Sequence, residues 1–284
     1  MPLSVLEIRV PILMYHSISQ TQNAKFRPFT VPPITFAAQM QYLTIAGYTP
    51  ITVTQFVQAM TTPEQTLPER PVILTFDDGF ADFFLNAFPI LQQHQFTATL
   101  YVATAFIEGT SHWLRREGEG MRPMISKNAL RHVHNYGIEC GGHTHSHPQL
   151  DTLTPEKAQH EIVHCKDVLE QLLGRRISSF AYPFGYTTPT VQSLVREAGY
   201  TSACAVKHRI TRYETDHFAL TRFMVSATTT LDAFGHLLNG DAIFGPQALY
   251  LHMRTPLWSV VRRSSAFVRQ RLQKRGEICD IHNL

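Results

Sequence analysis

Short apolar runs alternate with helix-like segments along most of the chain, and this alternation restricts the fold more than any other feature. Strand-like runs such as VPILMYH, RPVILTF, TATLYVAT and ISSFA are each followed by a segment with helical periodicity. Strands separated by helices pair in parallel, because the helix returns the chain to the same end of the sheet. The pattern predicts an α/β fold with about seven parallel strands, either open or closed into a barrel.

Helix start and stop signals support this division of the chain. The clearest predicted helix is TPEKAQHEIVHCKDVLEQLLG, with Thr154 as its N-cap, Pro155 in the first turn and Gly174 at its end. We expect Ser126 to cap another helix and Thr35 to cap the helix TFAAQMQYLTIAGY.

Length and composition narrow the class of protein. The chain has 284 residues, 44% of them apolar, and is long enough to bury a large core. Its net charge of +3 gives no indication of nucleic-acid binding. The four cysteines form no C-x-x-C pair and are expected to be free or buried thiols. No apolar run approaches the ~20 residues that cross a membrane, and the N-terminal segment lacks signal-peptide features, which favours a cytoplasmic location.

Polar side chains follow several of the predicted strands at the point where each strand ends. Asp77 and Asp78 follow RPVILTF, GGHTHSH follows IEC, YPFG follows SSFA, and His16 ends the first strand. Sites in parallel α/β folds gather at the carboxyl ends of strands. We therefore expect these four groups to converge on one rim.

The histidine motif and the double aspartate together suggest a metal site. Two histidines and one carboxylate form a known catalytic set for a divalent ion, and they leave positions open for water and substrate. His143 and His147 lie in a segment that Gly142 and Pro148 predict to be a turn. One aspartate would bind the ion and the other would act as general base. Alone, each motif has a simpler explanation, either a solvated histidine loop or an acidic helix cap, but their joint occurrence favours the metal.

The motifs TFDDG, HTHSH and YPFG, in this order and at these separations, resemble those of the polysaccharide deacetylases of the NodB-homology type (carbohydrate esterase family 4). The resemblance extends from Val10 to Ala227. It implies a distorted (β/α) barrel and metal-dependent removal of an acetyl group from an N-acetylated sugar.

The resemblance also implies roles for individual residues. Asp77 would be the general base, and the ion, usually zinc, would be held by Asp78, His143 and His147. His145 falls on a variable position of the motif. In YPFG the backbone N–H of Phe184 would help to bind the oxyanion. Tyr182 and Pro183 would shape the turn.

The chain departs from the family pattern at two points. The family places an arginine two residues before the proline of the third motif, where this chain has Ala181. Arg222 is the candidate to orient the base in its place, and we count it with the substrate-contacting residues. For the general acid, His16 resembles an N-terminal Tyr-His element of a circularly permuted subgroup that includes poly-N-acetylglucosamine deacetylases, and His252 in LYLHMR is a second candidate. We prefer His16 as the general acid. The simpler alternative is that His16 is a strand-end histidine whose ring is hydrogen-bonded to a backbone carbonyl.

Two further segments have open interpretations. Trp113 lies on a long loop at the same rim and is a candidate for stacking on a sugar ring or for anchoring its loop.

We expect residues 1–240 to form the barrel and residues 241–284 to form a basic helical extension packed on it. The segment from Arg254 to Arg275 carries seven basic residues and no acidic one. Docking of its apolar side is favoured over contact with an anionic membrane surface.

The sequence therefore predicts a zinc-dependent hydrolase that removes an N-acetyl group from a saccharide or glycoconjugate. Two alternatives stay open. The altered position at Ala181 is compatible with a hydrolase of another N-acyl or cyclic amide. The missing arginine is also compatible with a glycan-binding domain without activity, but the complete set of metal ligands and the base places this reading last.

Overall fold

The computed structural model describes residues 9–20, 23–62, 64–206, 211–212 and 216–240. The predicted C-terminal extension lies outside the described residues, and so do His252 and Cys279. Its docking and its contact with a membrane therefore stay predictions.

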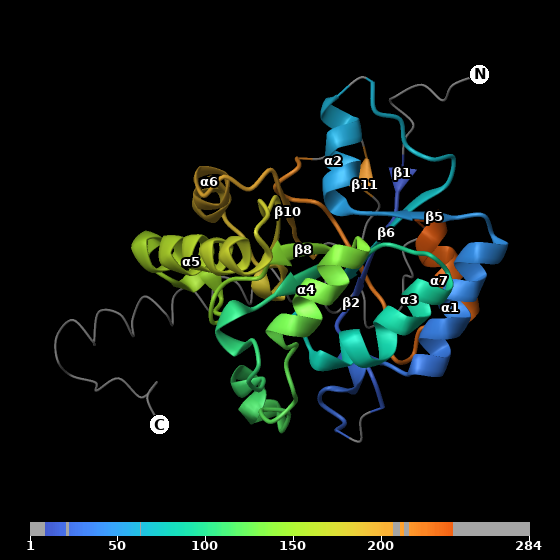
Figure 1. Ribbon diagram of the computed structural model, residues 1–284, viewed down its shortest axis with the longest axis horizontal. Helices are drawn as coiled ribbons and strands as arrows, with labels where there is room; N and C mark the ends of the chain where they lie inside the picture. Colours follow the sequence, from blue (N-terminus) through green and yellow to red (C-terminus); the bar gives the residue numbers. More distant parts are fainter. Residues whose placement is uncertain (1–8, 21–22, 63, 207–210, 213–215, 241–284) are drawn as a thin grey trace.

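A parallel sheet forms the centre of the fold (Figure 1). Every neighbouring pair in its main path is parallel. In spatial order the strands are β10 (Ser202–Cys204), β9 (Ser179–Ala181), β8 (Glu139–Gly142), β7 (Thr99–Val102), β6 (Pro71–Phe76), β2 (Ile12–Tyr15) and β12 (Phe223–Met224). An eighth strand, β5 (Thr49–Ile51), pairs with the first half of β6.

The segment between β10 and β12 brings the two edges of this sheet together. Leu220 forms a parallel bridge with Cys204 of β10, and three residues later Phe223 pairs with Leu13 of β2. The sheet therefore curls into a distorted barrel of about seven parallel strands, which confirms the predicted fold class.

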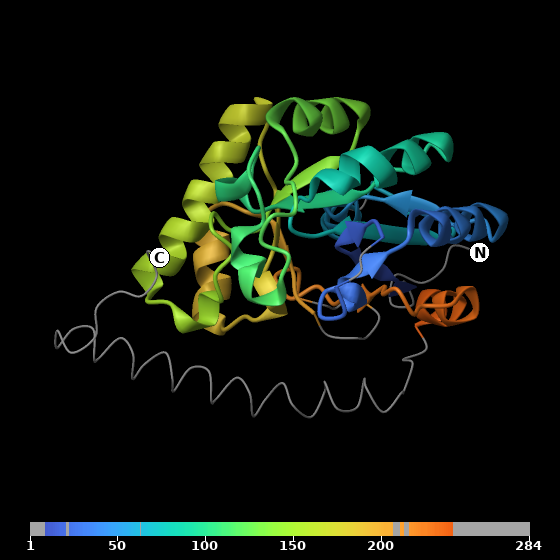
Figure 2. The same cartoon turned by 90° about the horizontal axis from the view of Figure 1, so that it is seen from below.

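Helices surround this sheet (Figures 1 and 2). The α-helices are α1 (Pro33–Ile45), α2 (Val53–Thr61), α3 (Phe88–Gln93), α4 (Lys127–Tyr136), α5 (Pro155–Leu173), α6 (Pro189–Glu197) and α7 (Leu231–Asn239). Shorter helical turns are η2 (Arg27–Phe29), the π-helical η3 (Phe83–Ala87), η4 (Thr104–Phe106), η5 (His112–Glu117), η6 (Leu150–Thr152) and η7 (Pro183–Gly185). Two small two-stranded sheets pair β1 (Arg9–Val10) with β11 (Thr211–Arg212) and β3 (Ser17–Ile18) with β4 (Thr30–Val31).

The predicted helix caps are mostly confirmed. Ser126 and Thr154 accept hydrogen bonds from backbone N–H groups of the first turns of α4 and α5. The predicted cap at Thr35 is wrong, because α1 begins at Pro33 and Thr35 lies within its first turn. Proline is preorganised for the first helical position, so it starts the helix earlier than the threonine would.

Apolar side chains pack on both sides of the sheet. All six residues of β6 are buried, as expected for a parallel strand covered on both faces. The three cysteines in the described residues are buried and free, as predicted. None of the helices in the described part of the chain has the length and apolar character needed to cross a bilayer.

Gly141 on β8 offers a test of how tightly the barrel is packed. A Cβ atom there would lie 2.6 Å from the Tyr101 ring and 2.8 Å from the carbonyl oxygen of Ser179. Gly141→Ala should therefore lower the free energy of unfolding by about 2–3 kcal/mol, measured by urea denaturation. At Gly47 a Cβ would meet nothing within 4 Å and only the φ of +71° opposes it, so Gly47→Ala should cost about 1 kcal/mol. Equal losses in the two variants would contradict this packing.

Candidate active site

The two adjacent aspartates lie in a tight turn at the carboxyl end of β6. Asp78 has a φ of +76° and Gly79 a φ of +80°, so two successive residues adopt the left-handed conformation. A Cβ at Gly79 would lie 3.1 Å from Val102, which leaves little room for a larger residue there. The turn gives the two buried carboxylates different partners, Arg222 for Asp77 and two histidines for Asp78.

His143 and His147 come from the loop after β8 and face Asp78. The Oδ1 atom of Asp78 lies 3.4 Å from Nε2 of His143 and 3.1 Å from Nε2 of His147. All three side chains are buried, and one ligand atom from each lies within 4.8 Å of the others. The two loops therefore bring two imidazole nitrogens and one carboxylate oxygen around a single point.

A backbone carbonyl orients the His143 ring and the Thr144 side chain fixes the backbone of His147, whose ring Nδ1 atom is buried without a hydrogen-bond partner among the described residues. The Nδ1–H group of His143 donates to the carbonyl oxygen of Ala181 at 2.8 Å, which leaves Nε2 as the ring atom that faces Asp78. Thr144 has a φ of +66°, and its hydroxyl oxygen accepts from the N–H of His147 at 3.0 Å. Sequence reasoning missed Thr144. The small hydroxyl residue between two histidines was the available signal, because such side chains often bond to nearby backbone groups.

The donor set fits a divalent metal ion. Two imidazoles and a carboxylate match three-ligand catalytic sites with open positions, and a metal-ligating histidine usually donates its other N–H to a carbonyl, as His143 does. Burial alone would raise the pKa of Asp78, but His147 and His143 hold this pKa well below its ordinary value. The carboxylate is therefore in the ionised form that binds metals.

Asp77 forms a buried, two-point ion pair with Arg222. Nη1 of Arg222 donates to Oδ1 of Asp77 at 2.6 Å and Nη2 donates to Oδ2 at 2.7 Å. Arg222 also donates to Thr75 and to the carbonyl oxygen of Ala205. Its side chain is fully buried, so it reaches Asp77 from inside the barrel and does not reach the exposed rim. Burial alone would raise the pKa of Asp77, but Arg222 holds it below its ordinary value.

His16 stands beside the two aspartates. The Asp77 N–H donates to the carbonyl oxygen of Tyr15 at 3.0 Å, so His16 and Asp77 begin the loops of neighbouring strands. The His16 ring packs against Phe29 with 5.2 Å between centroids, and its Nδ1 atom is buried without a hydrogen-bond partner among the described residues. Burial lowers the pKa of His16, while Asp78 and Asp77 partly offset this by favouring the protonated imidazole.

The YPFG turn lies on the other side of His147. Phe184 has a φ of +60°, and within the described part of the chain its N–H makes no hydrogen bond. The residue is 49% exposed, and the centroid of its ring lies 5.0 Å from that of the His147 ring. Pro183 is buried, and the Tyr182 hydroxyl donates to the Phe218 carbonyl oxygen at 3.0 Å. The turn therefore presents a backbone donor and an exposed aromatic face beside the histidines.

Trp113 packs directly on a proposed metal ligand. Its ring stacks on His147 at 5.0 Å and 29°, and it contacts Phe106 at 4.4 Å. Trp113 is half-buried in a small cluster with Phe80 and Met124. These contacts favour the loop-anchor interpretation over stacking on a sugar.

These features define a class of protein, a (β/α) barrel with a two-histidine, one-aspartate group at the carboxyl ends of its strands. Residues 64–203 match the family model described as polysaccharide deacetylase, and the chain belongs to this family. By that membership it is a hydrolase of carbon–nitrogen bonds other than peptide bonds.

Individual relatives agree with this assignment. The chain is 28% identical over 227 residues to the Bacillus subtilis protein YxkH, whose name places it in the same family, covering 80% of this chain and 75% of the relative. It is 22% identical over 228 residues to the poly-β-1,6-N-acetyl-D-glucosamine N-deacetylase of Staphylococcus aureus, covering 77% and 74%. The crystal structure of a polysaccharide deacetylase from Bacillus cereus superposes with a TM-score of 0.69 and 25% identity, covering 81% of this chain and 69% of that one.

Proposed function

We propose that this protein removes N-acetyl groups from an acetylated amino sugar or polysaccharide in a metal-dependent reaction. The proposal rests on the double-aspartate turn. In this turn Asp78 contacts His143 and His147, and Asp77 forms an ion pair with Arg222. The Staphylococcus aureus relatives are named for poly-β-1,6-N-acetyl-D-glucosamine, which supports an N-acetylglucosamine polymer as the substrate class.

Asp78, His143 and His147 would hold the divalent ion. Two imidazoles and one carboxylate favour zinc over the harder ions that prefer all-oxygen sites. A bound ion of this kind polarises the acetyl carbonyl and lowers the pKa of the attacking water.

The other residues of the site carry out the proton transfers and stabilise the negative charge that develops on the acetyl oxygen. Asp77 takes a proton from the attacking water, and Arg222 keeps its carboxylate ionised and fixed in direction. The N–H of Phe184 donates to the developing oxyanion, and one such donor is worth about 3 kcal/mol. His16 donates a proton to the leaving amine from the loop beside Asp77; burial lowers the pKa of its imidazole, which eases release of the proton, and the two carboxylates partly offset this lowering. The exposed ring of Phe184 offers an apolar face to the sugar.

The activity is tested by measuring acetate release from N-acetylglucosamine oligosaccharides, both β-1,4- and β-1,6-linked, with purified protein and added Zn²⁺. A panel of non-sugar N-acyl compounds and cyclic imides runs in parallel. We expect acetate from the sugars and no turnover of the other amides. Turnover of the non-sugar amides alone would contradict the proposal and indicate a hydrolase of another N-acyl or cyclic amide. Binding of the sugars without acetate release would indicate a glycan-binding domain without activity.

His16→Ala tests the general acid. Its kcat on an N-acetylated sugar should fall about 10²-fold, because the amine must then leave without a positioned proton donor. The zinc content should stay unchanged. On an aryl acetate, whose phenolate leaves without protonation, the variant should keep most of its activity. Equal losses on the amide and the ester would show that His16 has a different role.

A further inference from the structure

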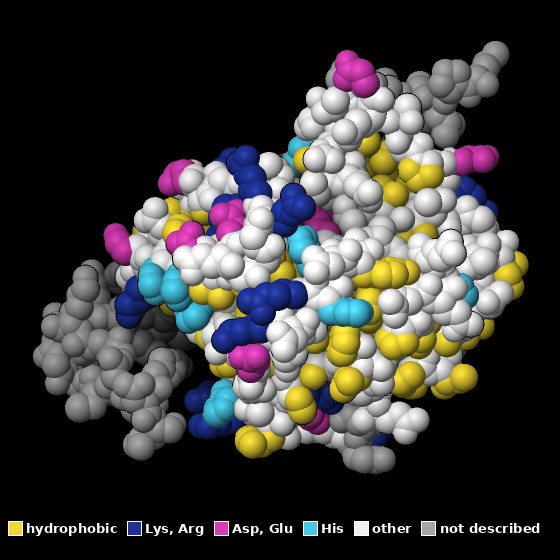
Figure 3. Space-filling view, viewed as in Figure 1, with side chains coloured by type: hydrophobic (Ala, Val, Ile, Leu, Met, Phe, Trp, Pro, Cys, Tyr) yellow, Lys and Arg dark blue, Asp and Glu magenta, His cyan; other side chains and the backbone are white. Residues whose placement is uncertain are grey.

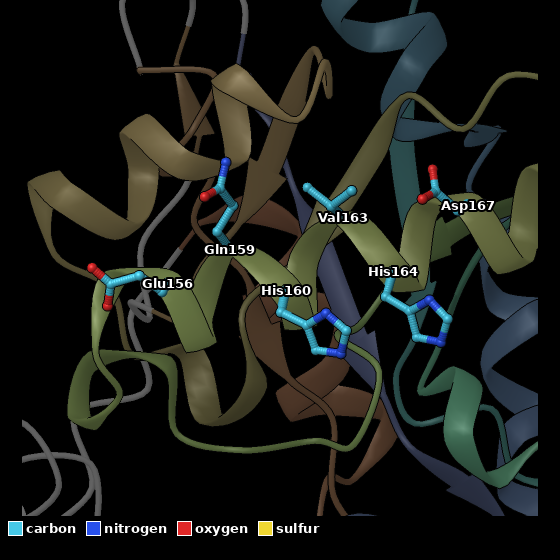
Figure 4. A pocket seen from close by; sticks show the side chains of 6 residues that line it. All are labelled: Glu156, Gln159, His160, Val163, His164 and Asp167. Atoms are coloured by element: carbon cyan, nitrogen blue, oxygen red, sulfur yellow. The ribbon is translucent and has the colours of Figure 1, made fainter. Parts of the chain in front are cut away.

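Three histidines outside the proposed centre lie together on α5 and the loop that follows β8. The rings of His160 and His164 are nearly parallel, at 7°, with centroids 5.4 Å apart. Figure 4 shows both projecting to the same side of α5, and Figure 3 shows histidine side chains at the surface over this helix. The ring of His145 meets His164 edge-on at 4.4 Å.

The sequence of this part of α5, HEIVH, has the H-E-x-x-H spacing with which two helical histidines bind zinc. Residues four apart stand about 5–6 Å apart on a helix, so rotation about their side-chain bonds brings two imidazole nitrogens to one ion.

The glutamate of this motif is engaged elsewhere. The Glu161 carboxylate accepts from the Ser146 N–H at 2.7 Å and from the Ser146 hydroxyl at 2.5 Å. In metalloproteases with this spacing the glutamate is the general base, and here it ties α5 to the histidine loop instead. The motif therefore supports metal binding without protease chemistry.

We propose that His160 and His164 form a second site for a divalent transition-metal ion such as Zn²⁺, with His145 as its third ligand. His160 is exposed, and the other two are half-buried, so solvent reaches all three. Thr104 bonds to Nδ1 of His145 at 2.9 Å, which leaves Nε2 as the donor atom.

This site is weaker than the proposed centre. Among the described residues, only Asp78, His143 and His147 form a group whose ligand atoms already converge. The three histidines at α5 must reorient, which costs side-chain entropy. An ion bound there would link α5 to the loop that carries the two histidines of the proposed centre.

The test is equilibrium dialysis of the metal-free, full-length protein against Zn²⁺, with bound zinc measured by atomic spectroscopy. We expect two ions per chain in the wild type and one in the His160→Ala/His164→Ala variant. His145→Ala should weaken the second site about 10-fold. His132→Ala is the matched control, because His132 is exposed on α4 with Asn128 and Tyr136 one turn away, and it should keep both ions.

The outcomes separate this site from the proposed function. Two ions in the His160→Ala/His164→Ala variant would overturn the second site. A single ion in the wild type that disappears in Asp78→Asn would also overturn it and would support the proposed centre. A single ion that disappears only in the His160→Ala/His164→Ala variant would support the second site and count against the centre.

Discussion

Asp78→Asn should abolish both zinc binding at the centre and deacetylation, whereas Asp77→Asn should abolish deacetylation alone. Asp78 offers its Oδ1 atom to the point that both Nε2 atoms face, at 3.4 and 3.1 Å. Loss of its charge should weaken zinc binding by more than about 100-fold, beyond the loss that outer-shell changes cause. Asparagine tolerates the left-handed φ of +76° at this position, so the turn itself should survive.

Asp77→Asn should keep the zinc, because both oxygens of Asp77 face Arg222 and not the histidines. Acetate release should fall about 10³-fold, as expected when a positioned general base is removed. Both variants are measured for zinc content and acetate release in the His160→Ala/His164→Ala background, which isolates the centre. Asp232→Asn on α7, whose side chain is 92% exposed, is the control and should change neither quantity. Full activity in Asp77→Asn, or loss of zinc in both variants, would contradict the division of roles.

The sequence was sufficient to place the motifs at one rim. RPVILTF and IECGG read as strands, and the loops after them carry Asp77, Asp78 and the histidines, so the topology of a parallel sheet brings these residues together. Hydrophobic periodicity is a strong signal for such buried strands, and the structure agrees with it closely here.

The local geometry of the site could not be predicted in the same way. Of the six non-glycine residues with positive φ among those described, four lie in the three motifs: Asp78, Thr144, His147 and Phe184. Left-handed backbone at such residues is sparsely populated and persists where surrounding contacts impose it. Periodicity reports which face of an element is buried, and it carries no information on the sign of φ.

The partner of Asp77 depended on long-range closure of the barrel. FALTRFMVS reads as one strand, yet only Phe223 and Met224 pair within the sheet as β12, and Leu220 bridges to β10. This change of partner places Arg222 between the two edges, with its side chain inside the barrel. The contact joins residues 145 positions apart, so no local pattern could fix it. The HEIVH spacing on α5 was also not recognised from the sequence. It points to a metal site only because the ring of His145 packs against His164 in the folded chain.

Arg222→Met should produce the second large effect, on activity and stability together. It leaves the buried Asp77 carboxylate without its partner, and removal of one member of a buried ion pair typically costs about 3–5 kcal/mol of unfolding free energy. Deacetylation should fall at least about 10²-fold, because the base loses both the bonds that fix its direction. Arg222→Lys keeps the charge but not the two-point contact, so it should lie between the wild type and Arg222→Met in urea denaturation and in kcat.

The pH dependence distinguishes a positioning role from a purely structural one. Arg222 holds the pKa of Asp77 below its unfolded value, so the pair stabilises the fold above the unfolded pKa, and this contribution is lost as pH falls through the folded pKa. In Arg222→Lys the pKa of Asp77 should rise, and the acidic limb of kcat/KM should move to higher pH. An unshifted limb in a folded but less stable variant would make Arg222 a structural residue only.

A double variant completes the argument. In Asp77→Asn/Arg222→Met the buried charge and its partner are both absent, so much of the stability lost in Arg222→Met should return while activity stays low. The thermodynamic cycle of the two single variants and the double variant measures the coupling energy of the pair. A coupling near zero would mean that each side chain stabilises the barrel independently, and Arg222 would then not be the group that replaces the arginine missing at Ala181.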